Sequence, residues 1–190
     1  MRKKSLSTYM KFIPIIFSLI LFTGCGSHMM AKTDLIAVDN QQAVVTFVRP
    51  SLFGGAIKFG IWDREKFIGI LTANSLMQYK TSPGEHLFIA QAENWSYVRA
   101  ELQAGKHYMI VGKVFPGLWK ARVALDPVKK GDKDNKQVEN WLAKVKPTAV
   151  ISEKVFAYQE PRLVNIKKAI HDYNAGNVKF QIIEIEDNIQ

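Results

Sequence analysis

Hydrophobic and polar residues alternate at every second position between residues 42 and 125. Ile57, Phe59 and Ile61 would lie on one face of a strand, and Trp62 would lie on the other. Turn clusters rich in glycine and proline separate such segments at spacings of roughly ten residues. The pattern predicts seven to eight short strands. Strands this short and this close together leave little room for crossover helices, which is typical of an all-β sandwich or a small barrel, and we expect an antiparallel β-sandwich over residues 42–126.

After residue 126 the apolar residues recur at helical spacing, every three or four positions. Two such stripes occur: Val138, Trp141, Leu142 and Val145, then Leu163, Ile166, Ile170 and Tyr173. A final strand is predicted over residues 178–185, whereas Thr148–Tyr158 fits either a strand or a helical turn. We therefore expect residues 127–190 to form an extension of two amphipathic helices and a strand that packs on the sandwich.

The first 24 residues have a different pattern from the rest of the chain. Three bases, Arg2, Lys3 and Lys4, and a further one at Lys11 precede an uncharged run over residues 12–22. A helix of eleven residues is about 16 Å long, roughly half of the hydrocarbon core of a bilayer. The segment is too short for a stable membrane span and is typical of a signal peptide.

The signal peptide ends in Leu21-Phe-Thr-Gly-Cys25, which resembles the lipobox of bacterial lipoproteins. Phe22 departs from the leucine that is usual there, although Leu21 precedes it. The resemblance implies cleavage before Cys25 and attachment of a lipid to its sulfur, with two or three acyl chains as the membrane anchor. The alternative is an ordinary signal peptide followed by an unrelated cysteine. Cys25 is the only cysteine, so it cannot form an internal disulfide.

The residue after the cysteine is Gly26, not the aspartate that retains many such lipoproteins in the inner membrane. The resemblance therefore implies an outer-membrane location in a Gram-negative cell, with the folded part facing the periplasm or, alternatively, the cell surface. Residues 25–41 are polar, small and without a clear period, and we expect them to be a tether. The sixteen residues after Cys25 would reach roughly 50 Å when fully extended.

Charge narrows the classes of partner only slightly. The chain has a net charge of +9, but the signal peptide contributes four bases and no acids, so the remainder is mildly basic. Its basic residues are spread singly, which is typical of a solvated surface. Weak attraction to anionic lipid head groups or lipopolysaccharide is the alternative. Nucleic-acid binding would need a concentrated basic stripe or a known motif, and none is present in the sequence.

Candidate catalytic and metal-binding residues are sparse. The four histidines, His28, His86, His107 and His171, are far apart in sequence and lack the spacing of metal ligands. No nucleophile motif or phosphate-binding loop occurs. We expect a protein that is not an enzyme and that has no cofactor. If it were instead a hydrolase or modifying enzyme of envelope glycans, the acids to examine would be Glu65, Glu93 and Glu101.

Three aromatic residues are the candidate binding residues. Trp62 lies on the polar face of its predicted strand, and Trp95 and Tyr97 lie at or beside a turn. Exposed aromatic rings stack on sugars or anchor protein partners. The alternative is structural: the C-terminal helices would bury Trp62, and Trp95 would pack over a loop.

Several short motifs in the predicted sandwich resemble a known class of domain. Val44–Pro50, Ser82-Pro-Gly-Glu-His86 and Ala104-Gly-Lys-His-Tyr108 are similar to segments of small lipoprotein domains of the PEGA or carboxypeptidase-regulatory type. The resemblance implies a β-sandwich with an accessory role in the cell envelope and no catalytic residues. We expect a membrane-tethered sandwich that binds or scaffolds another envelope component, a protein or a glycan.

Overall fold

The alternating segments of the chain pair into two β-sheets that face each other. The computed structural model describes residues 29–117 and 121–189. Its strands are β1 (Met30–Lys32), β2 (Ala43–Arg49), β3 (Phe59–Asp63), β4 (Lys66–Leu71), β5 (Ser75–Thr81), β6 (Gly84–Gln91), β7 (Trp95–Leu102), β8 (His107–Phe115), β9 (Arg122–Pro127), β10 (Lys146–Val150) and β11 (Gln181–Ile183). One sheet has the order β1-β10-β5-β2-β8-β9 and the other β11-β7-β6-β3-β4.

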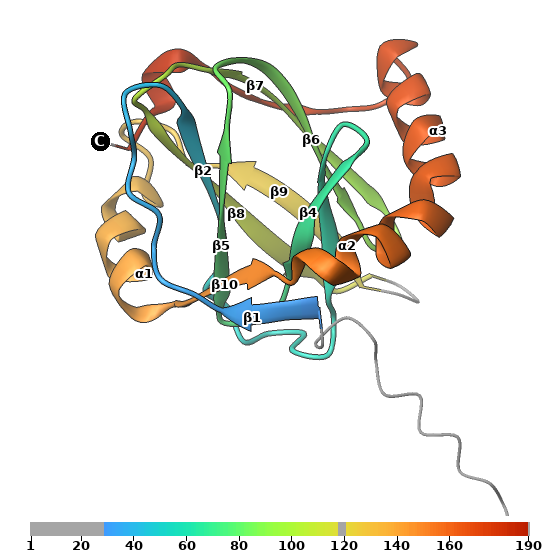
Figure 1. The fold of residues 1–190 in the computed structure, drawn as a ribbon, viewed down its shortest axis with the longest axis horizontal. Coiled ribbons are helices and arrows are strands. Elements are labelled where there is room, and N and C mark those ends of the chain that lie inside the picture. The colour runs from blue at the N-terminus through green and yellow to red at the C-terminus, as the bar shows by residue number, and fades with distance from the viewer. Residues whose placement is uncertain (1–28, 118–120, 190) are drawn as a thin grey trace, which may run out of the picture.

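Three α-helices follow the eight central strands: α1 (Val138–Lys144), α2 (Ser152–Gln159) and α3 (Leu163–Asn174). The segment that fits either a strand or a helix contains both, because β10 ends at Val150 and α2 begins two residues later. α1 and α3 lie on opposite sides of the pair of sheets (Figure 1). No helix among the described residues is long and apolar enough to span a membrane.

The mainly β fold confirms the prediction, but the antiparallel arrangement and the strand count were wrong. Three pairs are parallel: β2 with β8, β5 with β10, and β7 with β11. A parallel pair needs a long connection, which is usually a helix. Between β2 and β8 the connection consists of β3 to β7, most of which belong to the other sheet. Strands of the opposite sheet therefore provide the crossover that the sequence analysis assigned only to helices.

Apolar residues from both sheets fill the space between them. Phe47 of β2, Phe59 of β3 and Phe88 of β6 are all at most 1% exposed in this core. The alternate residues of the same strands face outward and are covered by helices. Trp62, Leu87 and Ile166 of α3 belong to a second apolar cluster on the outer face of the five-stranded sheet. Val138 of α1 packs in a third cluster, on the outer face of the six-stranded sheet.

Part of the segment expected to be a tether belongs to the fold. Met29 is 4% exposed, and its carbonyl oxygen accepts a hydrogen bond from the Ile151 amide at 2.8 Å. β1 pairs in antiparallel register with β10, with Met30 opposite Val150. Further along, the Ile36 amide donates to the Gln78 side chain, and Asp39 forms an ion pair with Lys80. The described part of the fold therefore already includes Met29, four positions after Cys25, which itself lies outside the described residues.

Candidate functional site

Two strands from different sheets meet at one edge of the sandwich, where side chains connect them. The Asn94 side chain accepts a hydrogen bond from the Val123 amide at 2.8 Å and donates to the Val123 carbonyl at 2.9 Å. The hydroxyl of Ser96 accepts a hydrogen bond from the Leu125 amide at 2.9 Å. β7 and β9 belong to different sheets and are not paired through their backbones, so these side-chain hydrogen bonds connect the two segments instead. They leave a cavity of about 230 Å³ lined by residues of β7, β9 and the segment that leads into β11.

Aromatic rings line this cavity, which we call the aromatic groove and define by Trp95, Tyr97 and Phe180. Phe180 is 41% exposed, and the Arg99 guanidinium lies 5.7 Å from its ring centroid. The Phe180 ring packs edge-on against Tyr173 of α3, with centroids 5.2 Å apart. The groove therefore presents a supported ring and a nearby cation, with Lys179 and Gln181 at its border. Such a mixed surface suits a sugar or a polar protein side chain.

The three aromatic candidates from the sequence differ in exposure. Trp95 is partly buried in the groove. Tyr97 is 5% exposed, stacks on Tyr173, and has a pKa raised by its burial and then by the nearby charge of Asp172. Trp62 has no exposed surface.

The burial of Trp62 has a clear cause. Its ring packs against Phe67, with centroids 5.1 Å apart, and against Tyr158 of α2, with centroids 6.4 Å apart. The helices thus cover the strand face on which Trp62 lies, which is the structural alternative that the sequence analysis left open. In this structure its ring has no free face for a ligand.

Phe180 was not among the residues singled out in the sequence, although it lies within the segment predicted as the last strand. Its exposure depends on how that segment leaves α3 and joins the edge of the sheet, and periodicity cannot show this. The sequence signal that could have identified Phe180 is an aromatic residue next to Lys179 in a predicted strand that follows a helix. The groove brings together Trp95 and Phe180, which are 85 positions apart in sequence.

The three acids examined for a hydrolase do not share one cleft. Glu93 lies in the turn between β6 and β7 and lines a separate cavity of about 450 Å³ together with Ile57 and Lys58. Glu101 lies near the other end of β7, where it pairs in register with Glu85. Eight residue steps, mostly along β7, separate the two positions, roughly 26 Å. Glu65 is in the β3–β4 turn, 3.5 Å from Lys167 of α3, and is exposed.

Two of the four histidines are buried in hydrogen-bonded positions at strand ends. His86 Nδ1 lies 2.7 Å from the Asp63 carboxylate, and its Nε2 lies 3.0 Å from the Ser82 carbonyl oxygen. His107 Nε2 lies 2.7 Å from the Thr46 hydroxyl. His171 is exposed on α3, and His28 lies outside the described residues. Within residues 29–117 and 121–189, no group of three metal-ligating side chains occurs.

The resemblance to PEGA-type or carboxypeptidase-regulatory-type domains, like the lipobox, stays a prediction. The search of protein-family models, the search of curated proteins and the search of solved structures each found no match to this chain.

Proposed function

We propose that this chain is a lipid-anchored protein of the outer membrane whose sandwich binds another envelope component, a protein or a glycan, in the aromatic groove. The lipid on Cys25 would hold the protein at the bilayer, and the folded part would face the periplasm. A tethered domain meets partners on the same surface at high effective concentration, so that a small interface suffices. The protein would act by binding, without a catalytic step.

The supported ring of Phe180 is the observation that carries the binding proposal. A large apolar side chain that stays in water forgoes the free energy that its burial would contribute. Phe180 is nevertheless held in place by Tyr173 and flanked by Arg99. Fixed rings lose little conformational entropy when a partner binds, which is why aromatic and arginine residues dominate binding hot spots.

A crosslinking pair in living cells tests the binding proposal. A photo-crosslinking amino acid at position 180 should capture one reproducible envelope protein or a glycan adduct. Ile185 is the matched control, because its exposed fraction is 42% against 41% for Phe180. Capture of the same species from both positions, or of none from position 180, would contradict the proposed groove.

A separate labelling experiment tests the anchor. Cells fed a clickable palmitate analogue should label the native protein and should not label a Cys25→Ser variant. The native protein should fractionate with outer membranes, and the variant should appear in the soluble fraction. Equal labelling of both proteins would show that Cys25 does not carry the lipid.

A further inference from the structure

The loop between β2 and β3 displays two large apolar side chains to solvent. We call residues 50–58 the Arg49 loop, after the residue that precedes it. Leu52 is 73% exposed and Phe53 is 58% exposed, although both lie in a short connection. Exposed apolar residues side by side in a loop tip mark surfaces that bind a partner or a membrane.

A buried arginine holds this loop in shape. Arg49 has no exposed surface, and its guanidinium donates to the carbonyl oxygens of Phe53 and Gly54, each at 2.8 Å, and to that of Ile57. Burying a guanidinium is costly unless its hydrogen bonds are made. Gly54 adds a left-handed turn with φ of +63°. These hydrogen bonds give the loop a defined backbone conformation. That conformation holds the side chains of Leu52 and Phe53 in solvent.

The position of the anchor limits where this loop can be, and this step rests on the proposed lipid at Cys25. Four residue steps separate Cys25 from Met29, the first residue that the structure describes. A fully extended chain of that length spans at most about 14 Å. The head-group layer of one leaflet takes up roughly 5–8 Å of that reach. The part of the fold near Met29 must then lie against the bilayer surface.

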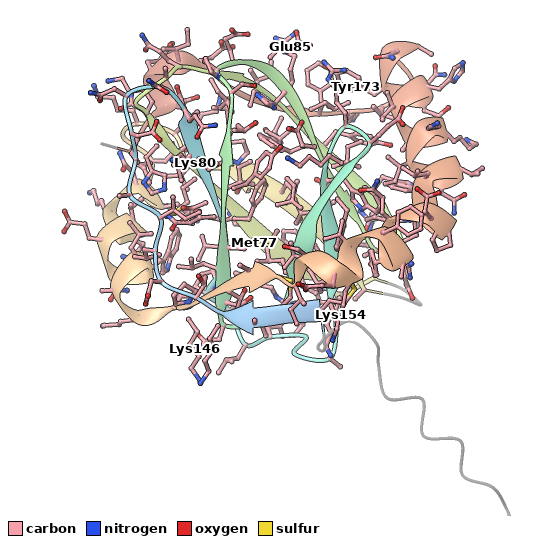
Figure 2. The ribbon with its side chains drawn as sticks, in the orientation of Figure 1. Met77, Lys80, Glu85, Lys146, Lys154 and Tyr173 are labelled. Atoms are coloured by element: carbon pink, nitrogen blue, oxygen red, sulfur yellow. The ribbon has the colours of Figure 1, made fainter. Side chains whose placement is uncertain are left out.

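The Arg49 loop lies at the same edge of the molecule as this entry point. Arg49 pairs in register with Ser75, and Ser75 pairs with Lys146, so these three residues lie at one level across three strands. β1 and the loop between β2 and β3 both run along the lower edge in Figure 1. Figure 2 shows the exposed Lys146 side chain pointing away from that edge. Lys58, at the end of the loop, is also exposed.

We propose that this edge of the sandwich docks on the bilayer that holds the anchor, with Leu52 and Phe53 inserted at the boundary between head groups and acyl chains. Lys58 and Lys146 would face the phosphates of anionic lipids. The lipid on Cys25 supplies attachment, and the Arg49 loop fixes the orientation. The aromatic groove then has a fixed orientation relative to the membrane.

Fluorescence quenching in vesicles tests the docked orientation. A Leu52→Cys variant of the full lipidated protein carries an environment-sensitive dye on its new thiol, because lipidation leaves Cys25 without one. Ser82→Cys is the control, since Ser82 is exposed and follows the far end of β5. The seven residues of β5 place it roughly 23 Å further from the membrane edge. The vesicles contain phosphatidylethanolamine with a minority of phosphatidylglycerol and a spin-labelled lipid quencher.

The dye at position 52 should be quenched several-fold more strongly than the dye at position 82. Adding Phe53→Ser should reduce the quenching at position 52, whereas Val164→Ser, which removes a 78% exposed apolar side chain from α3, should leave it unchanged. Equal quenching at positions 52 and 82 would overturn the proposal. A blue shift at position 52 that depends on protein concentration without lipid would assign the loop to a second copy of the chain and would also overturn it.

Vesicle flotation separates this proposal from the one on which it rests. A protein that does not float with the vesicles lacks its anchor, and both proposals fail. A protein that floats but shows no preferential quenching at position 52 keeps the anchor and loses only the docked orientation.

Discussion

His86 is near the start of β6 and is 8% exposed. Both of its ring nitrogens face hydrogen-bond acceptors. Its Nδ1 donates to the Asp63 carboxylate and its Nε2 to the Ser82 carbonyl. Only the protonated ring has a hydrogen on each nitrogen. Burial lowers the pKa of His86, but the hydrogen bond and the charge of Asp63 outweigh it, and the pKa stands above its ordinary value. The folded state therefore favours the charged ring.

A His86→Gln variant should lose stabilisation that depends on pH. Because the folded-state pKa exceeds the unfolded-state pKa, the stabilisation is complete below about pH 6.5 and declines as pH rises through the folded-state pKa. Urea unfolding at several pH values measures it: the free-energy difference between native protein and variant should shrink in alkaline buffer. A difference that is constant with pH would show that the ring is not charged in the fold.

His107 should change the free energy of unfolding with pH in the opposite direction. It is 5% exposed, and burial lowers its pKa to about 4. Between about pH 6.5 and pH 4, His107 is protonated in the unfolded chain but not in the folded chain. The free energy of unfolding therefore decreases as pH falls through this range. The loss amounts to about 3 kcal/mol across that window.

A His107→Gln variant should therefore resist acid better than the native protein when both are compared with their own stability at pH 7. Urea unfolding at pH 7 and at about pH 4.5 gives the comparison. Equal losses of unfolding free energy in the two proteins would contradict the buried neutral ring.

At the scale of elements, the helical extension is part of the sandwich's packing. Ile166 of α3 has no exposed surface and packs in the cluster that contains Trp62, whereas Val164, two residues earlier, is 78% exposed. Ile166→Ala should lower the free energy of unfolding by about 2–5 kcal/mol. Val164→Ala should change it by less than about 0.5 kcal/mol. Thermal unfolding followed by tryptophan fluorescence would show both.

Ile166→Ala also tests whether the extension unfolds separately. One cooperative transition that moves to lower temperature is expected, because Trp62 of β3 senses the same cluster. A second transition at lower temperature, with the strand signal unchanged, would indicate two independent units.

The sequence predicted elements well where one face of the chain is buried and the other is not. Each of the eight strands from β2 to β9 corresponds to a segment predicted as a strand, β2 from its continuous apolar run and β3 from its alternating residues, and α1 and α3 correspond to the two apolar stripes. β1 was missed because it is a three-residue strand at the sheet edge, and β10 was predicted only as one of two alternatives for Thr148–Tyr158, because it is short and contains Pro147. Their pairing depends on a partner more than 110 residues away, which no local pattern contains.

The candidate site was less predictable than the fold. Trp95 and Tyr97 were identified from their place beside a turn, but Phe180 joins them only through the parallel pairing of β11 with β7. Leu52 and Phe53 occupy a turn cluster, where two adjacent large apolar residues are themselves a signal. Arg49 gave no such signal, because the sequence does not show that a charged strand end is buried.

At the scale of the whole molecule, the two sheets approach each other closely at Gly112, which has no side chain. A Cβ atom at Gly112 of β8 would lie 2.6 Å from Leu71 Cδ2 and 2.9 Å from Phe59 Cζ, both in the opposite sheet. Gly112→Ala should therefore force the buried Leu71 and Phe59 side chains, or the sheets that carry them, to shift, and should cost about 1–3 kcal/mol. Gly55→Ala is the control, because the nearest atom to its Cβ is 3.4 Å away. Chemical denaturation of both variants checks this, and equal effects would contradict it.

Tension on an anchored N-terminus would enter this molecule through β1, which has three residues and lies at the outer edge of its sheet next to β10. Among the described residues, the load reaches the hydrogen bond between Met29 and Ile151 first and then the pair of Met30 and Val150. An antiparallel ladder pulled from one end opens one pair at a time, so β1 would detach at low force while β2, enclosed between β5 and β8, stays paired. If the N-terminus carries the proposed lipid and a partner holds the groove, the molecule would lengthen at β1 first, and the groove would keep its shape.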